Sequence, residues 1–151
     1  MPKLSLLIEE TAVVLRDIQL QQLPTLTQSK DWQSKYRLLM QLGKPLPAFD
    51  ASLQRDDFLI AGCESKAWLL HEYHADSRRH YWAFDSEARI IKGLVVVALC
   101  QINGLTKDEL VTIQFDQLFA LQGVQQNLSP SRQNGLQAVL KQLCKQAGLA
   151  D

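Results

Sequence analysis

The sequence predicts an α+β fold with two N-terminal helices, a small three-stranded antiparallel sheet and C-terminal helices packed on one face of that sheet. Leucine (26 residues) and glutamine (17 residues) dominate the composition, and both lose little rotamer freedom in a helix. Short aromatic-rich segments, which favour strands, occur in the middle of the chain. The 151 residues contain no repeat, low-complexity tract or linker, so we expect a single domain over residues 1–151.

Two helices are expected before the aromatic segments. Apolar residues recur close to a 3.6-residue period over residues 4–21, which predicts a helix followed by a polar loop over Pro24–Lys30. A second helix is expected over about Asp31–Leu42, with Gly43 at its C-terminal cap. The segment Lys44–Pro47 cannot continue it, because proline lacks the amide donor.

Three short segments predict the sheet. They are Phe58–Ile60, Ala67–Tyr73 and His80–Phe84, and each combines aromatic or branched apolar residues with flanking polar ones. Asp76 and Ser77 fit a turn between the last two segments. This turn has no glycine, which indicates a loop longer than a tight two-residue hairpin.

The most apolar part of the second half predicts a central buried helix. Apolar residues from Ile90 to Ile102 leave almost no polar face, and Gly104 is a stop signal. We expect Asp85 or Ser86 to cap this helix, with Glu87 in its first turn, where the helix dipole favours an anion.

Three further helices are expected before the C-terminus. Thr106 followed by Glu109 is a capping box that opens a short helix. Asp116–Gln122 predicts another, closed by a glycine. Ser129–Pro130 is a cap and first-turn pair that starts the last helix, which we expect to end near Gly148.

The charge pattern excludes two classes of partner. The formal net charge is zero, and basic and acidic residues are balanced in both halves of the chain. A nucleic-acid binder shows a basic field and a polybasic membrane protein a basic cluster, so neither partner is expected. The longest apolar run, Leu94–Cys100, has seven residues, whereas a membrane span needs about 20. Two glutamates interrupt the N-terminal apolar stretch too early for a signal peptide, so we expect a cytoplasmic protein.

Cys63 is the candidate reactive residue. The three cysteines are an odd number and widely spaced, so they form neither a disulfide framework nor a zinc motif. Cys100 and Cys144 lie in helical apolar patterns and are expected to be buried. Cys63 instead follows Gly62 and precedes Glu64, at a break between predicted strands where glycine permits a sharp turn. It is either a nucleophile or sulfur carrier at a loop tip, or a small apolar filler.

The histidines do not predict a metal site. His71 and His74 are three residues apart on a strand and therefore point to opposite faces. We expect only His74 and His80 to meet across the hairpin, and two ligands are too few for zinc. The sequence also lacks the glycine-rich phosphate-binding and nucleophile-elbow motifs, so no cofactor is expected.

Arg132 lies at the predicted start of the last helix. The amide groups of that turn and the guanidinium can together hold an anion. The alternative is a capping turn with a solvated arginine.

Four segments of the chain form a recognisable set. They are Trp32-x-x-Lys35-Tyr36 through Leu42-Gly43-Lys44-x-Leu46-Pro47, Gly62-Cys63-Glu64-Ser65-x-x-Trp68, Asp85-Ser86-Glu87-Ala88-x-Ile90-x-Lys92-Gly93-Leu94, and Leu128-Ser129-x-Ser131-Arg132-x-x-Gly135-Leu136. Together they resemble the SufE/CsdE family of sulfur-acceptor proteins, which serve cysteine desulfurases. The resemblance covers about residues 30–150, in the family's order and with similar spacing, and the Cys-Glu doublet and the Asp-Ser-Glu stretch are closer to the CsdE branch.

The resemblance implies both a mechanism and a fold. The partner is a pyridoxal-phosphate-dependent cysteine desulfurase of the SufS/CsdA kind, which holds sulfur from L-cysteine as a persulfide. Cys63 matches the acceptor position, so it is expected to take this sulfur and stimulate the desulfurase. A downstream acceptor then carries the sulfur towards iron–sulfur cluster assembly or another sulfur pathway. Arg132 matches a motif near the acceptor loop, and Gly62 and Glu64 flank the cysteine. The resemblance therefore implies an accessory sulfur-transfer protein rather than a stand-alone enzyme.

Two alternatives remain open from the sequence. The family fold is also similar to that of the IscU-type iron–sulfur scaffold proteins, but a scaffold needs several thiolates close together. A non-catalytic partner that regulates a desulfurase allosterically is the other alternative, and it would not need Cys63. The N-terminal 30 residues are longer than the family pattern, so nothing functional is carried over to them.

Overall fold

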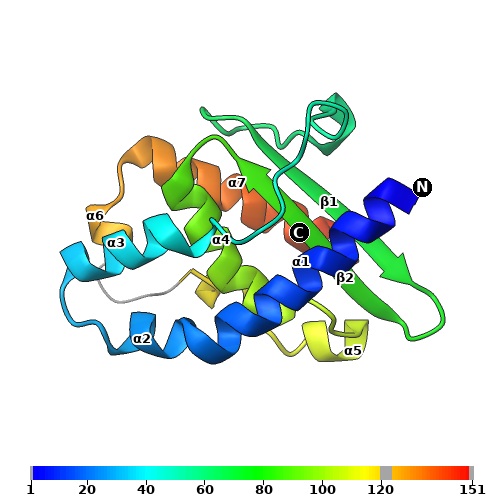
Figure 1. The fold of residues 1–151 in the computed structure, drawn as a ribbon, viewed down its shortest axis with the longest axis horizontal. Helices are drawn as coiled ribbons and strands as arrows, with labels where there is room; N and C mark the ends of the chain where they lie inside the picture. Colours follow the sequence, from blue (N-terminus) through cyan, green and yellow to red (C-terminus); the bar gives the residue numbers. More distant parts are fainter. Residues whose placement is uncertain (1, 120–123, 150–151) are drawn as a thin grey trace.

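The computed structural model describes residues 2–119 and 124–149, and its fold is α+β (Figure 1). One antiparallel hairpin lies among helices from both ends of the chain. The elements in chain order are α1 (Pro2–Gln21), α2 (Leu23–Gln28), α3 (Trp32–Leu42), the 3-10 helix η1 (Asp56–Phe58), β1 (Ala67–His74), β2 (Arg79–Ser86), α4 (Arg89–Ile102), α5 (Lys107–Leu110), the 3-10 helix η2 (Phe115–Gln117), α6 (Val124–Asn127) and α7 (Pro130–Gln146).

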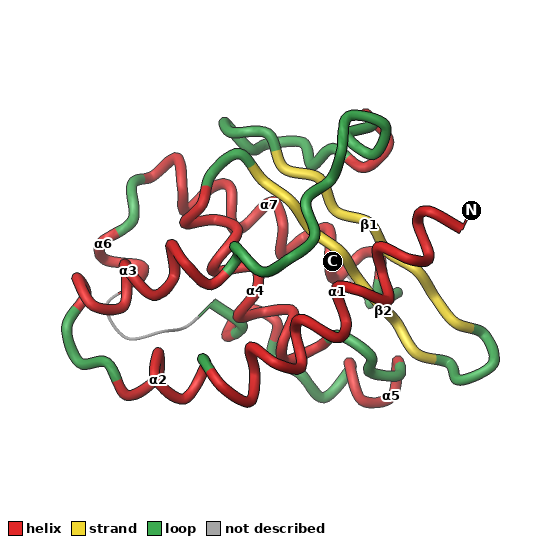
Figure 2. The backbone as a smooth tube through the Cα atoms, in the orientation of Figure 1, coloured by secondary structure: helices red, strands yellow, loops and turns green. Residues whose placement is uncertain are grey.

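Each face of the hairpin contributes to a different apolar cluster. Leu69, Trp82 and Phe84 pack with residues of α4 and α7 in the larger cluster. On the other face, Trp68 and Leu70 pack with the first turns of α1 and the segment after α3. Figure 2 shows the two strands with helices on both sides. The C-terminal helices therefore cover one face of the sheet, and α1 covers the other.

The sheet has two strands, so the prediction of three strands is wrong. Strands β1 and β2 pair along their whole length, from Ala67 opposite Ser86 to His74 opposite Arg79. Before them, Leu59 forms only an isolated bridge with Trp68. A longer strand is prevented because a 3-10 turn ends at Phe58 and the chain turns again after Ile60.

The expected polar loop after α1 is also wrong, because Leu23–Gln28 forms α2. Pro24 lies in the first turn of α2, where its missing amide costs nothing. Proline therefore starts a new helix here as well as stopping the first. The prediction for α3 is confirmed: the Asp31 carboxylate accepts the Ser34 amide at 2.8 Å, and Gly43 is the C-cap.

The cap of α4 predicted at Asp85 or Ser86 is wrong, because the helix begins two to three residues later. β2 extends through Ser86, and the N-cap position is Ala88, which provides no side-chain cap. The Ser86 hydroxyl accepts the Ala88 amide at 3.1 Å just before the helix. Glu87 lies outside the first turn, and its carboxylate accepts the Lys66 amide at 3.2 Å. Glu87 therefore ties the end of β2 to the start of β1, whereas the Asp85 carboxylate pairs with the Lys92 ammonium of α4 at 3.1 Å.

The central position of α4 is confirmed. Eleven of its 14 residues are buried, in agreement with the absence of a polar face in the sequence. It packs against α3, α7, α1 and β2. The helix ends at Ile102, and Gly104 follows with a positive φ of 82°, as expected for a stop signal.

The C-terminal predictions are confirmed in part. Ser129 caps α7 and Pro130 is its first residue. Of the helix expected over Asp116–Gln122, the structure has the short 3-10 helix Phe115–Gln117, and residues 120–123 lie outside the described part of the chain.

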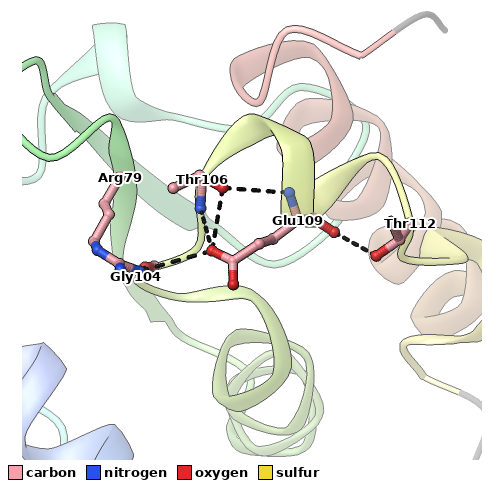
Figure 3. Close-up of polar contacts among 5 residues, drawn as sticks. All are labelled: Arg79, Gly104, Thr106, Glu109 and Thr112. Atoms are coloured by element: carbon pink, nitrogen blue, oxygen red, sulfur yellow. Dashed lines mark hydrogen bonds and ion pairs between the residues drawn. The ribbon is translucent and has the colours of Figure 1, made fainter.

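The capping box of α5 is present, and its removal gives a first prediction (Figure 3). The Thr106 hydroxyl accepts the Glu109 amide at 3.3 Å, and the Glu109 carboxylate accepts the Thr106 amide at 3.0 Å. Thr106→Ala should lower the free energy of unfolding by about 1 kcal/mol, because the Glu109 amide loses its hydroxyl acceptor and the Glu109 carboxylate loses the hydroxyl donor. Urea denaturation measures this change. Thr106→Ser keeps the hydroxyl, so its free energy of unfolding should stay close to that of the parent protein. Equal losses of stability in both variants would contradict a capping role of the hydroxyl.

The histidine pairing differs from the prediction. His71, not His74, meets His80: the two ring nitrogens are 2.8 Å apart and the rings are stacked. The register explains this, because His71 lies opposite Trp82 and shares a face with His80, whereas His74 contacts Glu72 on the other face. The pKa of His71 is lowered to about 4, first by burial and then by the neighbouring His80. Burial also lowers the pKa of His80.

This buried pair predicts an acid-sensitive fold. Between about pH 4 and 6.5, the unfolded chain binds more protons at these histidines than the folded chain, so the free energy of unfolding should rise with pH across this window. Urea denaturation at several pH values measures the slope. His71→Gln should flatten it, because the substitution removes the side chain whose pKa is lowered most in the folded protein. An unchanged slope in His71→Gln would exclude this histidine as its source.

Candidate functional site

Cys63 lies on the loop between η1 and β1, against the N-terminal part of α7. Gly62, with a φ of +90°, turns the chain immediately before it, as the sequence indicated. The thiol is half-buried, and its sulfur lies 3.6 Å from the Gly135 carbonyl oxygen. A Cβ atom built on Gly135 would lie 3.7 Å from this sulfur. That is an ordinary van der Waals distance, so the backbone of α7 lies against the thiol without requiring glycine at this position.

A small cleft surrounds the thiol. Its free volume is about 10 Å³, which is about the room that a single water molecule needs. Ile91 of α4 forms part of its wall, together with Ser86 at the end of β2. Three distant segments therefore converge on Cys63, and the cleft as it stands has no room for a substrate side chain.

The two polar residues after Cys63 are held by α7. The Ser131 hydroxyl donates a hydrogen bond to the Glu64 carboxylate. The Arg132 guanidinium donates to the Ser65 hydroxyl oxygen at 3.0 Å. Two successive residues of the loop are thus fixed by two successive residues of the first turn of α7.

All four residues singled out in the sequence lie at this cleft or next to it. Cys63, Glu64 and Arg132 line it, and Gly62 precedes the thiol. Of the two interpretations of Arg132, the capping turn is present, because the Ser129 hydroxyl accepts the Arg132 amide at 3.2 Å. The side chain is half-buried and bonded to Ser65 rather than fully solvated, and anion binding at this turn stays a prediction. Ser65 and Ser131 were not singled out. Serines are common in loops and caps, and only the fold brings these two loop and helix positions together.

Burial is the main influence on the pKa of the Cys63 thiol. It raises the pKa of Cys63 above the ordinary value of a free cysteine. The thiolate, which is the nucleophilic form, is therefore scarce at neutral pH. The carboxylate of Glu64, the next residue, is turned to Ser131. The geometry describes a shielded, weakly nucleophilic thiol that three segments of the chain hold in place.

The other two cysteines lie elsewhere. Cys100 is buried near the end of α4, as expected, and its sulfur lies 3.5 Å from the Leu15 carbonyl oxygen. Burial raises its pKa to about 12. Cys144 on α7 is only partly buried, so the expectation of full burial is wrong for this residue. Over residues 2–119 and 124–149, no group of three or more histidine, cysteine or acidic side chains is placed to hold a metal ion.

The sequence matches the family model described as SufE, Fe-S metabolism associated domain, over residues 21–147. The chain belongs to the SufE family. Residues 30–150, over which the sequence resembles this family, are almost the same range, and the match includes Cys63 and Arg132. Helix α1 lies almost wholly outside the matched residues.

Three curated proteins illustrate the SufE relationship. The chain is 40% identical over 108 residues to the sulfur acceptor protein CsdE of Escherichia coli, with 72% of this chain and 73% of that protein covered. An uncharacterized SufE-like protein of Haemophilus influenzae is 39% identical over 122 residues, which cover 79% of this chain and 96% of that protein. Another, from Rhizobium etli, is 31% identical over 119 residues, or 78% and 80% of the two chains.

Within the part of this SufE-family chain that the structure describes, no helix is long and apolar enough to cross a membrane.

Proposed function

We propose that this protein accepts sulfur on Cys63 from the persulfide of a cysteine desulfurase. The observation that carries the proposal is the position of Cys63 in a chain of the SufE family: it lies on a loop that turns at Gly62, apart from the other two cysteines. A relative that is 40% identical bears the name sulfur acceptor protein. The pyridoxal phosphate that generates the persulfide belongs to the desulfurase.

The transfer is a thiol exchange that needs no oxidant. The Cys63 thiolate attacks the terminal sulfur of the partner's persulfide, a new sulfur–sulfur bond forms on Cys63, and the partner's cysteine leaves as a thiolate. The proton lost from Cys63 is balanced by the one that the partner's thiolate takes up. A single thiol is sufficient, which agrees with a site that contains one cysteine and no second thiol among the described residues of its walls.

The cleft must open for this exchange. With about 10 Å³ free beside the thiol, a second cysteine cannot approach Cys63 in line. We propose that docking of the desulfurase moves the Gly62–Glu64 loop outward, with Gly62 as the flexible residue. Movement requires the contacts of this loop with α7 to break, namely the hydrogen bond from Ser131 to Glu64 and the contact of the Cys63 sulfur with the Gly135 carbonyl oxygen. The closed position protects the thiol, and later the carried sulfur, from stray oxidants.

The reactivity of Cys63 towards iodoacetamide tests the docking step. At pH 7 the free protein should be alkylated slowly, because the thiol is half-buried and burial raises its pKa. Saturating desulfurase, with its own active cysteine replaced by alanine, should accelerate the reaction clearly. Since the thiolate fraction grows with pH, labelling of the free protein should also speed up above pH 7.

Each part of the labelling experiment has an outcome that would contradict the proposed docking step. Alkylation of the free protein as fast as that of an unstructured peptide thiol would mean that the loop is already open. No acceleration by the desulfurase would mean that docking does not expose Cys63, as expected for a purely allosteric partner. Peptide mapping separates Cys63 from the partly buried Cys144, which should label at the same rate with and without the partner.

We further propose that the chain works as a single domain in the cytoplasm and passes its sulfur to a downstream acceptor. Its three cysteines are all unpaired, as is usual in a reducing compartment. An iron–sulfur scaffold is the less favoured function, since a cluster needs several thiolates within one site. Here Cys63 lies beside α7, whereas Cys100 contacts α1.

A further inference from the structure

A second cavity lies away from the thiol, between α1, the start of β2 and the end of α4. Its volume is about 300 Å³, at the lower end of the range for small-molecule sites. Cys63 lies beside Ile91 in the first turn of α4, whereas Leu99 and Asn103 in the last turns line this cavity. Eight residues of helix separate Ile91 from Leu99, or about 12 Å. The cavity is therefore distinct from the candidate sulfur site.

Two arginines from different elements line the cavity. Arg16 comes from α1 and makes no hydrogen bond or ion pair with any other residue that the structure describes. Arg79 comes from the first position of β2, and its guanidinium donates to the Gly104 carbonyl oxygen at 2.7 Å, which fixes its orientation (Figure 3). No carboxylate is among the described residues that line the cavity. Two guanidinium groups thus line the same cavity, and no carboxylate among its described lining residues neutralises them.

Glu109 is the acidic residue that pairs with Arg79, and it does not neutralise the cavity. Its carboxylate lies 3.7 Å from the Arg79 guanidinium, in a pair whose two side chains are about half exposed. Such a pair is weak in water. The same carboxylate oxygen also accepts the Thr106 amide in the capping box. Arg16 remains uncompensated on the opposite wall.

The rest of the lining suits a small organic anion. The Asn103 side-chain oxygen accepts the Trp82 amide at 2.7 Å, so its NH2 group is the part that a ligand can use. Gln19 adds a second amide, while Leu15 and Leu99 supply apolar surface. Guanidinium groups bind carboxylate and phosphate oxygens through paired hydrogen bonds. We propose that this cavity binds a small organic oxyanion, a carboxylate or phosphate ester with a short apolar body, between Arg16 and Arg79.

Titration of the folded protein with succinate and with inorganic phosphate tests the proposal, with chloride at equal ionic strength as the reference. Amide shifts in two-dimensional NMR should move saturably around residues 12–19, 79–81 and 99–104. Arg16→Gln should raise the Kd at least tenfold, and it removes none of the contacts that hold the described fold together. Arg37→Gln, an exposed arginine on α3, should leave the Kd unchanged. Tighter binding of succinate or of phosphate identifies the preferred head group.

Two outcomes would overturn the proposal. Shifts that are spread over the surface, or that chloride reproduces, would show charge screening without a site. Equal Kd values for the parent protein and Arg16→Gln would show that the anion binds elsewhere. Neither outcome affects the proposed role of Cys63, because the two sites share none of the residues that line them.

Discussion

Replacement of Cys63 with serine should abolish sulfur acceptance and stimulation of the desulfurase, while the fold remains intact. Serine keeps the shape of the side chain, but its hydroxyl cannot accept a sulfur atom by thiol exchange. The half-buried position next to Gly135 tolerates the smaller oxygen. Sulfide release from L-cysteine by the desulfurase, with and without the variant, measures the stimulation, and circular dichroism checks the fold.

Cys100→Ala and Cys144→Ala are the matched controls. Both should keep full activity, because their sulfurs lie outside the Cys63 cleft. Cys100→Ala should cost about 1 kcal/mol of stability, since it leaves a small void in the core, and the partly buried Cys144 should cost less. Full stimulation by Cys63→Ser would contradict the acceptor function and favour a non-catalytic partner.

Replacement of Gly93 with alanine should produce a larger loss of stability than removal of the α5 cap or of the Cys100 sulfur. Gly93 lies at the crossing of α3 and α4, and a Cβ atom there would be 2.0 Å from the Leu39 carbonyl oxygen. The obstructing atom belongs to the backbone, so the two helices must move apart. We expect a loss of about 3 kcal/mol, which is a large share of the stability of a single domain. Thermal and urea denaturation measure it.

Gly135→Ala is the matched control for Gly93→Ala. Gly135 also lies within a helix, but a Cβ atom there would be 3.7 Å from its nearest neighbours, which is an ordinary contact. Alanine is favoured over glycine in a helix by about 0.5–1 kcal/mol, so this variant should be as stable as the parent protein or more stable. Equal losses in the two variants would mean that helix packing at Gly93 is not the cause.

Most of the fold could be predicted from local patterns. The helices α3, α4 and α7 follow from apolar periodicity combined with caps, and the capping box of α5 follows from two residues at the correct spacing. The failures have a common origin. The third strand and the cap of α4 depended on which neighbour each segment meets, and tertiary contacts decided both. Pro24 was assigned to a loop, although the same residue is favourable in a first turn.

The candidate site was only partly visible in the sequence. Cys63 and Gly62 stand out because a glycine-cysteine pair interrupts the strand pattern, and the family resemblance adds Arg132. The pairing of the loop with α7 could not be predicted. Ser65 and Ser131 stand in two of the segments that resemble the family, but their partners Arg132 and Glu64 are 67 positions away in the chain. Shielding of the thiol by the backbone of α7 is likewise a consequence of packing. The oxyanion cavity has no sequence signature, since it joins arginines of α1 and β2 that are far apart in the chain.

Mass spectrometry of the protein after incubation with a cysteine desulfurase and L-cysteine tests the acceptor function most directly. The peptide that contains Cys63 should gain the mass of one sulfur atom, and the gain should disappear after treatment with a reducing thiol. The peptides that contain Cys100 and Cys144 should remain unchanged. An unmodified Cys63 peptide in the presence of a turning-over desulfurase, or sulfur found on either of the other cysteines, would contradict the proposal that Cys63 is the acceptor.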